Sequence, residues 1–161
     1  MMFAVLTISD RCSQGLMEDT AGPAVAALLR EHWPTADVQR GLLPDDENLI
    51  TQRLLALSSG SEAAALILTV GGTGLGPRDH TPEATRKVME REVPGLSEAI
   101  RAIGAQANPY AWLSRGVAGL RGQTLIVNLP GSKRGAEESL RSIVRLLAHG
   151  LEVVGGGQTH P

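Results

Sequence analysis

Short apolar runs alternate along the chain with longer segments of mixed polar and apolar residues. The apolar runs predict strands over residues 3–9, 36–43, 63–70 and 124–129. Most of these runs are nearly continuous, as is typical of strands that are buried on both faces of a sheet. The mixed segments predict helices over residues 24–30, 44–57, 82–91, 96–107 and 133–151. We expect a polar loop over 10–19 and an irregular extended hairpin over 111–122.

Helix-start signals support these boundaries. Asp19 and Thr20 are N-cap candidates, Pro82 is suited to the first turn of its helix, and Pro94–Gly95 is expected to separate two helices. The alternation of strands and helices predicts an α/β fold of three layers (αβα), with a mostly parallel sheet between two helical layers. We expect one domain over residues 1–154, followed by a flexible glycine-rich tail at 155–161.

Distinctive residues follow the predicted strands. In open α/β sheets, ligands bind beyond the carboxyl ends of the strands, and these ends lie along one edge when the strands are parallel. The segments that we expect to converge there are Ser9–Asp10, Pro44–Asp45, Gly71–Gly74 and Asn128–Ser132.

Composition narrows the function classes. The formal net charge of the 161 residues is −2, without the basic excess of a general nucleic-acid-binding protein. Aromatic residues, which would stack on nucleic-acid bases, make up only 2%. Cys12 is the single cysteine, which excludes an intrachain disulfide and a thiolate metal cluster. Residues 1–8 lack the basic region of a signal peptide and lead directly into the first predicted strand, so we do not expect them to act as one. No apolar run approaches the roughly 20 residues of a membrane span. We therefore expect a cytoplasmic protein that binds neither nucleic acid nor membrane.

The loop that follows the third strand carries the clearest chemical signal. Gly71, Gly72 and Gly74 would expose backbone N–H groups to an anion, and Thr73 adds a hydroxyl group. The loop is not a Walker A motif, because no Gly-Lys-Ser/Thr follows, and it lacks the third glycine of a dinucleotide fingerprint. A tight turn is the alternative. Because the glycine loop directly follows the most strongly predicted strand, we favour phosphate binding over a simple turn.

Two acidic residues are placed for catalysis. Asp45 and Asp79 each follow a strand end, and two carboxylates near a polyphosphate would suit Mg²⁺, directly or through water. The alternatives are that Asp45 only caps its helix and that Asp79 forms a surface salt bridge with Arg78.

Three further features allow a functional or a structural interpretation. The segment Asn128–Ser132 resembles an anion site at a helix start, or Ser132 simply caps that helix. Ser114 and Arg115 could hold a phosphate or lie in a solvated turn. Cys12 could be a nucleophile or an incidental loop cysteine, and no histidine lies near it in the sequence to activate it.

Taken together, these motifs resemble the molybdopterin adenylyltransferase family, the MogA/MoaB type that includes the G domain of gephyrin. The segment from Gly71 to Thr85 resembles the family signature. Matching motifs extend along most of the chain in the same order: Leu6–Asp10, Asp19–Pro23, Pro44–Asp45, Pro94–Gly95, Leu113–Gly119 and Thr124–Gly131.

The resemblance implies a specific chemistry. AMP would pass from Mg-ATP to the terminal phosphate of molybdopterin, late in the synthesis of the molybdenum cofactor. Asp45 and Asp79 match the family's two essential acids, and Gly71–Gly74 matches its nucleotide-phosphate region. Ser114 and the segment Asn128–Gly131 match the lining of the pterin and phosphate pocket. The resemblance also implies a homotrimer and a separate molybdenum insertase as a possible partner.

Other functions stay open at this point. The chain could be a non-catalytic module that binds molybdopterin for an insertase. It could also be a nucleotide pyrophosphatase related to the competence-damage proteins, which share the fold but tend to carry Gly-Gly-Leu-Gly-Pro-Thr where this chain has Gly72–Pro77. A Rossmann dehydrogenase is disfavoured because no glycine loop follows the first strand.

Overall fold

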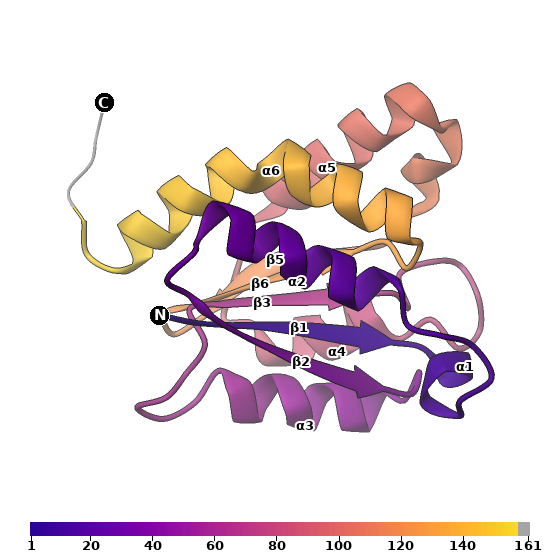
Figure 1. Ribbon diagram of the computed structural model, residues 1–161, viewed down its shortest axis with the longest axis horizontal. Coiled ribbons are helices and arrows are strands. Elements are labelled where there is room, and N and C mark those ends of the chain that lie inside the picture. The colour runs from indigo at the N-terminus through magenta and orange to yellow at the C-terminus, as the bar shows by residue number, and fades with distance from the viewer. Residues whose placement is uncertain (158–161) are drawn as a thin grey trace.

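A mixed six-stranded sheet forms the centre of the molecule in the computed structural model, which describes residues 1–157 (Figure 1). The strands lie in the order β2-β1-β3-β6-β5-β4. The first four in this order are parallel, and β5 and β4 are each antiparallel to the preceding neighbour. Their bounds are Met2–Ile8 (β1), Asp37–Leu43 (β2), Leu66–Val70 (β3), Arg91–Glu92 (β4), Ala118–Arg121 (β5) and Thr124–Leu129 (β6).

Helices cover both faces of this sheet. Helices α2, α5 and α6 pack on one face, and α3 and α4 pack on the other (Figure 1). The bounds of the helices are Asp10–Ser13 (α1), Ala21–His32 (α2), Glu47–Leu57 (α3), Thr81–Val88 (α4), Pro94–Ala107 (α5), Pro109–Leu113 (η1, a 3₁₀ helix) and Lys133–Val154 (α6). The predicted three-layer α/β fold with a mostly parallel sheet is confirmed.

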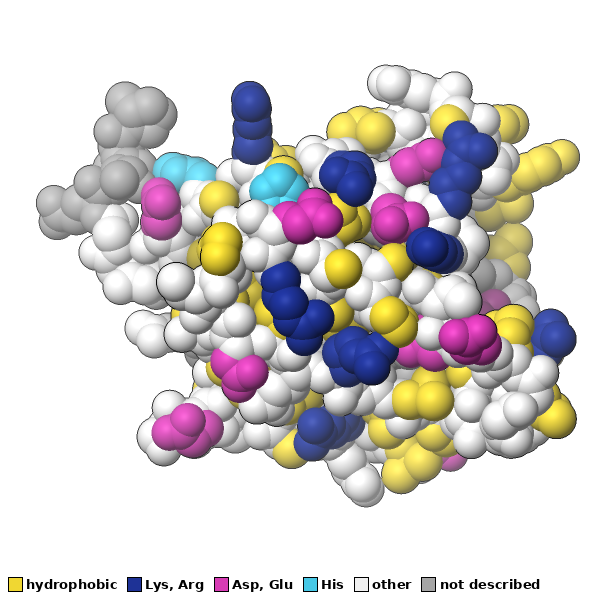
Figure 2. Space-filling model, viewed as in Figure 1, with side chains coloured by type: hydrophobic (Ala, Val, Ile, Leu, Met, Phe, Trp, Pro, Cys, Tyr) yellow, Lys and Arg dark blue, Asp and Glu magenta, His cyan; other side chains and the backbone are white. Residues whose placement is uncertain are grey.

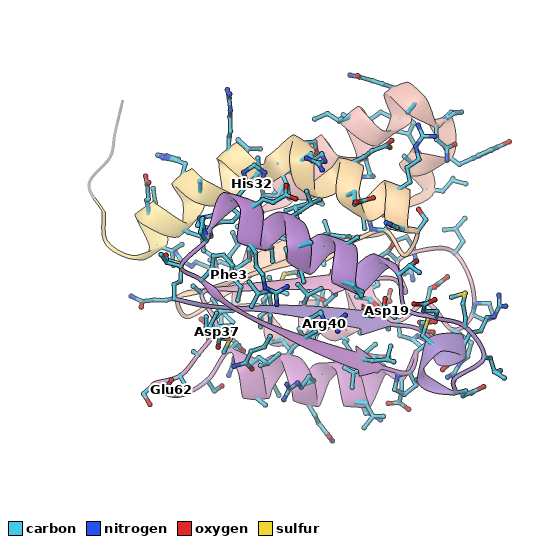
Figure 3. All side chains as sticks on the ribbon, in the orientation of Figure 1. Phe3, Asp19, His32, Asp37, Arg40 and Glu62 are labelled. Atoms are coloured by element: carbon cyan, nitrogen blue, oxygen red, sulfur yellow. The ribbon has the colours of Figure 1, made fainter. Side chains whose placement is uncertain are left out.

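Strand β1 shows why an uninterrupted apolar run is needed. Its side chains alternate between the two faces, and helices cover both. Phe3 and Val5 belong to the core beneath α2 and α6, and Ala4 and Leu6 belong to the core beneath α3. Phe3, labelled in Figure 3, meets Trp33 edge to face at a ring-centroid distance of 5.3 Å.

Several predicted boundaries were wrong. Part of the expected loop over 10–19 forms helix α1, because Ser9 caps it by accepting a hydrogen bond from the Cys12 backbone N–H at 3.2 Å. Helix α4 ends at Val88 and not near residue 91. Arg91 and Glu92 form the short strand β4, which has no local signal because its partner β5 lies far along the chain.

The segment around residues 94–122 also differs from the prediction. Pro94 does not separate two helices but is the first residue of α5, where its missing N–H costs nothing. The expected hairpin over 111–122 begins as the 3₁₀ helix η1 and only then becomes strand β5.

At the other end of the chain, α6 ends at Val154, and Gly155 and Gly156 follow it in a turn. The rest of the predicted tail, 158–161, lies outside the described residues. Within residues 1–157, no helix combines the length and the apolar character that crossing a membrane requires. Acidic and basic side chains are interspersed on the face shown in Figure 2.

Candidate active site

The candidate site lies at the point of the sheet where successive strands are added on opposite sides of β1. From β1 the chain first passes to β2 on one side, and the chain later enters β3 on the other side of β1. Such a point opens a crevice at the carboxyl ends of the two central strands. Gly71, directly after β3, has φ +108°, and an added Cβ would overlap the carbonyl oxygen of Ile8. A Cβ on Gly131, after β6, would lie 3.1 Å from the Gly71 Cα. Only glycine permits this close packing of backbones.

An acidic pocket of about 580 Å³ lies over these strand ends. Its lining includes residues that the sequence placed at the site, namely Ser9, Asp45, Gly71, Gly72, Asp79, Gly131 and Ser132. Segments that follow β1, β2, β3 and β6 therefore meet in one cavity, as expected for parallel strands. Lys133, the first residue of α6, also lines this pocket.

A second pocket of about 600 Å³, here called the helical pocket, lies between the glycine loop, α5, η1 and the start of α6. The predicted residues that line it are Thr73, Gly74, Ser114, Pro130 and Ser132. Ser132 lines both pockets. The glycine loop and the turn 130–132 thus form a thin partition, with one pocket on each side.

The carboxylate of Asp45 is held at the acidic pocket by the chain after β1. The Asp10 backbone N–H donates to Asp45 Oδ2 at 2.8 Å, and the Asp45 N–H donates to Asp10 Oδ1 at 3.0 Å. Burial raises the pKa of Asp45, and the negative charges of Asp10 and Asp79 raise it further. The neighbouring residue Asp46 caps α3, by accepting from the Leu49 N–H at 2.9 Å. The capping alternative for Asp45 is therefore wrong.

The second acid, Asp79, is held by its own loop. Its Oδ2 accepts a hydrogen bond from the Gly76 N–H at 2.8 Å. The predicted alternative, an ion pair with Arg78, is wrong, because Arg78 donates two hydrogen bonds of 3.0 Å to Asp10 instead. The hydrogen bond from Arg78 holds the pKa of Asp10 below its usual value.

These contacts give Asp10 a structural role in addition to the predicted substrate binding, which stays a prediction. Both of its carboxylate oxygens accept hydrogen bonds within the protein, from the Asp45 N–H and from Arg78. The side chain therefore supports Asp45 and ties it to the loop after β3. Ser9, in contrast, lines the acidic pocket while it caps α1.

Arg115 likewise proves to be a structural side chain. Its guanidinium group donates to the backbone oxygens of Gly74 and Asp79 at 2.7 and 2.6 Å, and it also pairs with Glu83. Burial is the largest single influence on the pKa of Glu83 and would raise it, but the hydrogen bond from Arg115, a backbone hydrogen bond and the positive charges of Arg115 and Arg86 together lower it. The predicted Ser-Arg phosphate pair is therefore wrong for Arg115. The neighbouring Ser114 lines the helical pocket.

Asn128 also differs from the prediction. Its side chain is buried, and its Oδ1 accepts from the Val117 N–H at 3.1 Å. Its Nδ2 donates to the hydroxyl groups of Thr69 and Thr85, at 2.9 Å each. With both amide protons used inside the protein, Asn128 positions β6 and the segment beside β5 and does not reach a ligand in this conformation.

Ser132 and Cys12 can now be placed. Ser132 caps α6 by accepting from the Gly135 N–H at 3.2 Å, and the same residue lines both pockets, so the two interpretations of Ser132 are compatible. Cys12 is buried in α1 against the acidic pocket. No histidine lines that pocket in the described part of the chain. The position of Cys12 thus offers no base to form a thiolate.

Sequence reasoning missed several pocket residues. Asp19 lines the acidic pocket and is held there by hydrogen bonds from the Thr7 hydroxyl and the Gly22 N–H, at 2.8 and 2.9 Å. Figure 3 labels Asp19 near the carboxyl end of β1. Arg101 and Tyr110 line the helical pocket. Asp19 had a local signal, its place two residues before α2, whereas Arg101 and Tyr110 reach the pocket only through the packing of α5 and η1.

The acidic pocket suits Mg²⁺ that arrives with a phosphate ligand. Within residues 1–157, no group of three or more His, Cys, Asp or Glu residues is arranged to hold a metal ion alone. Asp45 and Asp79 provide two carboxylates that line one cavity and repel each other electrostatically. Mg²⁺ commonly binds through one or two carboxylates plus water and substrate phosphates. The residues present therefore fit this ion.

The fold and the site thus define an α/β protein with two adjoining cavities, which meet at the glycine loop and the start of α6. The chain belongs to the family whose model is described as "Probable molybdopterin binding domain", which matches residues 4–149.

Similar proteins share most of this chain. It is 36% identical to the molybdopterin adenylyltransferase of Escherichia coli, over 94% of this chain and 80% of that protein. It is 35% identical to that of Helicobacter pylori strain J99, over 94% of this chain and 86% of that protein. The molybdenum cofactor synthesis protein cinnamon of Drosophila melanogaster is 43% identical, but the chain spans only 25% of its length.

Solved structures agree with this assignment. The molybdopterin biosynthesis enzyme MoaB from Thermus thermophilus is 47% identical, with a TM-score of 0.85 over 96% of both chains. A MogA structure is 37% identical, with a TM-score of 0.88 over 96% of this chain and 99% of that one. The CinA protein of Thermoplasma acidophilum, 16% identical with a TM-score of 0.69, shares the fold alone.

Proposed function

We propose that this chain is a molybdopterin adenylyltransferase that transfers AMP from Mg-ATP to the terminal phosphate of molybdopterin. The observation that carries the proposal is the pair of pockets that adjoin at Ser132. A transfer between two large anions requires two binding cavities whose reacting ends meet. The relatives named molybdopterin adenylyltransferase match over most of their own length, which supports the same reaction.

For this reaction the protein has to align the two anionic substrates and neutralise their negative charge. An oxygen of the molybdopterin phosphate forms a bond to the α-phosphorus of ATP, and the bond from that phosphorus to the bridging oxygen breaks. Pyrophosphate leaves with the electron pair. The attacking phosphate is already an anion at neutral pH, so no general base is needed. The barrier comes from repulsion between the two anions, and preorganised donors lower it.

We assign the triphosphate to the acidic pocket. Asp45 and Asp79 would hold Mg²⁺ there, and the ion would supply positive charge beside the phosphates. Lys133 lines the same pocket and adds a protein cation. No hydrogen bond within residues 1–157 uses the N–H groups of Gly72, Thr73 and Gly74. The Gly72 N–H is thus available to the triphosphate in the acidic pocket, and the N–H groups of Thr73 and Gly74, which line the helical pocket, are available to the phosphate of the second ligand.

We assign molybdopterin to the helical pocket. Its phosphate would lie at Ser132 and Ser114, close to the N-terminus of the long helix α6, where the aligned peptide dipoles favour an anion. Pro130 and Gly131 shape the turn that brings this helix start to the partition. The assignment places the attacking phosphate beside the triphosphate, with the glycine loop between the two ligands.

The wider setting is also part of the proposal. By the family resemblance, we propose a cytoplasmic homotrimer whose product passes to a separate molybdenum insertase. Sedimentation velocity of the purified protein checks the trimer, and a monomer at all concentrations would contradict it.

Two-substrate binding tests the proposed function. An ATP analogue with a methylene group between the α- and β-phosphorus atoms binds but cannot transfer AMP. We expect molybdopterin to bind the protein saturated with Mg²⁺ and this analogue, and we expect authentic ATP to give adenylylated molybdopterin and pyrophosphate. Competition between the two ligands would contradict the two-pocket assignment. Simultaneous binding without product from ATP would favour the non-catalytic binding module instead.

A further inference from the structure

Thr81, the first residue of α4, carries a buried hydroxyl group without a partner. Its side chain is fully buried, and Oγ1 is the one buried side-chain nitrogen or oxygen atom within residues 1–157 that forms no hydrogen bond. The backbone groups of the same residue are satisfied: its N–H donates to the Gly72 carbonyl at 3.1 Å, and its carbonyl accepts from the Thr85 hydroxyl at 2.8 Å. Buried polar groups almost always have partners, so this exception needs an explanation.

The hydroxyl group lies directly against Gly72 of the glycine loop. Gly72 has φ +64°, and a Cβ added there would overlap Thr81 Oγ1 and lie 3.1 Å from Asp45 Oδ1. The Thr81 hydroxyl and the Asp45 carboxylate therefore lie against the same side of Gly72. Gly72 and Asp45 both line the acidic pocket, whereas Thr81 lies behind them.

The oxygen of Asp45 that faces this side is also free of hydrogen bonds. Asp45 Oδ2 accepts from the Asp10 N–H, while no donor within residues 1–157 bonds Oδ1. A hydroxyl group without an acceptor and a carboxylate oxygen without a donor thus both lie next to the space that a Cβ of Gly72 would fill. A small movement of the Gly72 loop or of the Asp45 side chain would join them.

We propose that Thr81 is a positioning residue for Asp45, whose carboxylate it orients by donating a hydrogen bond to Oδ1 when Mg-ATP occupies the acidic pocket. The inference rests on the proposed function only in taking Mg-ATP as the ligand of this pocket. Partners behind a metal-binding carboxylate fix its orientation and strengthen its binding. In the free protein the hydroxyl group has no hydrogen-bond partner, and this buried, unsatisfied group lowers the stability of the fold.

Removal of the Thr81 hydroxyl group should weaken Mg-ATP binding without lowering the stability of the free protein. A threonine with a purely structural role would not show this combination. In Thr81→Val a methyl group replaces the hydroxyl at nearly the same volume. We expect the free variant to melt at the same temperature as the wild type or higher, because no hydrogen bond is lost. We expect the Mg²⁺ concentration for half-maximal ATP binding to rise about tenfold, the usual scale for losing such a partner. Thr81→Ser, which keeps the hydroxyl group, should restore most of the affinity.

Thr85→Val is the matched control. It removes a buried hydroxyl group from the same helix, but one that bonds Asn128 and the Thr81 carbonyl. We expect Thr85→Val to lower the melting temperature and to leave the Mg²⁺ dependence of ATP binding near the wild-type value.

We would test the role of Thr81 by calorimetric titration of ATP at several Mg²⁺ concentrations and by melting curves of the free proteins. Unchanged Mg²⁺ dependence in Thr81→Val, or no rescue by Thr81→Ser, would overturn the proposal. Wild-type protein that binds Mg-ATP but transfers no AMP would overturn the proposed function and leave the Thr81 test intact. Wild-type protein that binds no ATP at any Mg²⁺ concentration would overturn both.

Discussion

Asp10 and Asp45 hold each other through two reciprocal hydrogen bonds, each from the backbone N–H of one residue to the carboxylate of the other, at 2.8 and 3.0 Å. The two residues follow β1 and β2 and are separated by 35 positions in the sequence. Arg78, from the loop after β3, closes the arrangement by pairing with Asp10. Segments that follow three strands thus fix the orientation of the Asp45 carboxylate, for which we propose a catalytic role.

This relationship makes Asp10 testable as a support for Asp45. Asp10→Ala removes the acceptor of the Asp45 N–H and the partner of Arg78, so we expect AMP transfer to fall about tenfold or more, the scale for groups behind a metal ligand. Asp10→Asn keeps an acceptor oxygen and should retain more activity than Asp10→Ala. Steady-state rates of both folded variants give the comparison. Equal, wild-type rates in both would show that Asp45 does not depend on Asp10.

The two proposed Mg²⁺ ligands should be indispensable. We expect Asp45→Asn and Asp79→Asn to fold normally and to lose about 10²–10³ in the rate of AMP transfer, the usual loss for one preorganised charge-stabilising group. Asp46→Asn is the matched control for Asp45, because asparagine caps a helix about as well as aspartate and Asp46 caps α3. Near-wild-type turnover in both site variants, or an equal loss in Asp46→Asn, would contradict the carboxylate assignment.

The environment of Asp45 predicts a pH dependence. Its pKa in the folded protein is raised above the ordinary value of 3.8, chiefly by burial. Asp45 therefore keeps its proton at pH values at which an exposed aspartate has lost it. The ionised form, which we propose to bind Mg²⁺, is lost as the pH falls through this raised pKa. NMR titration of the free protein should give a midpoint for Asp45 above 3.8, and added Mg²⁺ should lower it. A midpoint at or below the ordinary value would contradict this environment.

The pair Glu83–Arg115 should stabilise the fold above the acidic range. The folded-state pKa of Glu83 is lowered, so its contribution is fully present above the unfolded pKa, near 4.5, and is lost as the pH falls through the folded value. We expect Glu83→Gln to cost roughly 0.5–1 kcal/mol in the free energy of unfolding at neutral pH, since both side chains are partly exposed. The free energies of unfolding from urea titrations of both proteins should converge as the pH falls through the lowered pKa of Glu83. A difference that does not shrink would assign the cost to packing.

Much of the fold could be predicted from periodicity alone. Continuous apolar runs identified β1, β3 and β6, because strands buried on both faces need apolar residues at every position. The short strand β4 and the 3₁₀ helix η1 escaped prediction, since β4 exists only through pairing with β5. Local propensity carries no information about such distant partners.

The sequence likewise predicted part of the candidate site and not the rest. Glycines and acids at strand ends could be found because parallel strands bring those ends together, which placed Asp45, Asp79 and Gly71 correctly in one pocket. The directions of individual side chains could not be found. Asn128 follows the same pattern, yet its amide group turns into the core toward Thr69 and Thr85. Whether an acidic residue faces the pocket, like Asp45, or holds a neighbouring carboxylate in place, like Asp10, depends on hydrogen bonds that form only in the folded chain.

The most direct test follows the α-phosphate of ATP. Purified protein, Mg²⁺ and ATP labelled at the α-phosphorus are incubated with and without molybdopterin, and the label is followed into the pterin. The account predicts labelled, adenylylated molybdopterin only when both substrates are present, with the signal lost in Asp79→Asn and retained in Asp46→Asn. Molybdopterin that binds but never acquires the label in the wild-type protein would contradict the central claim.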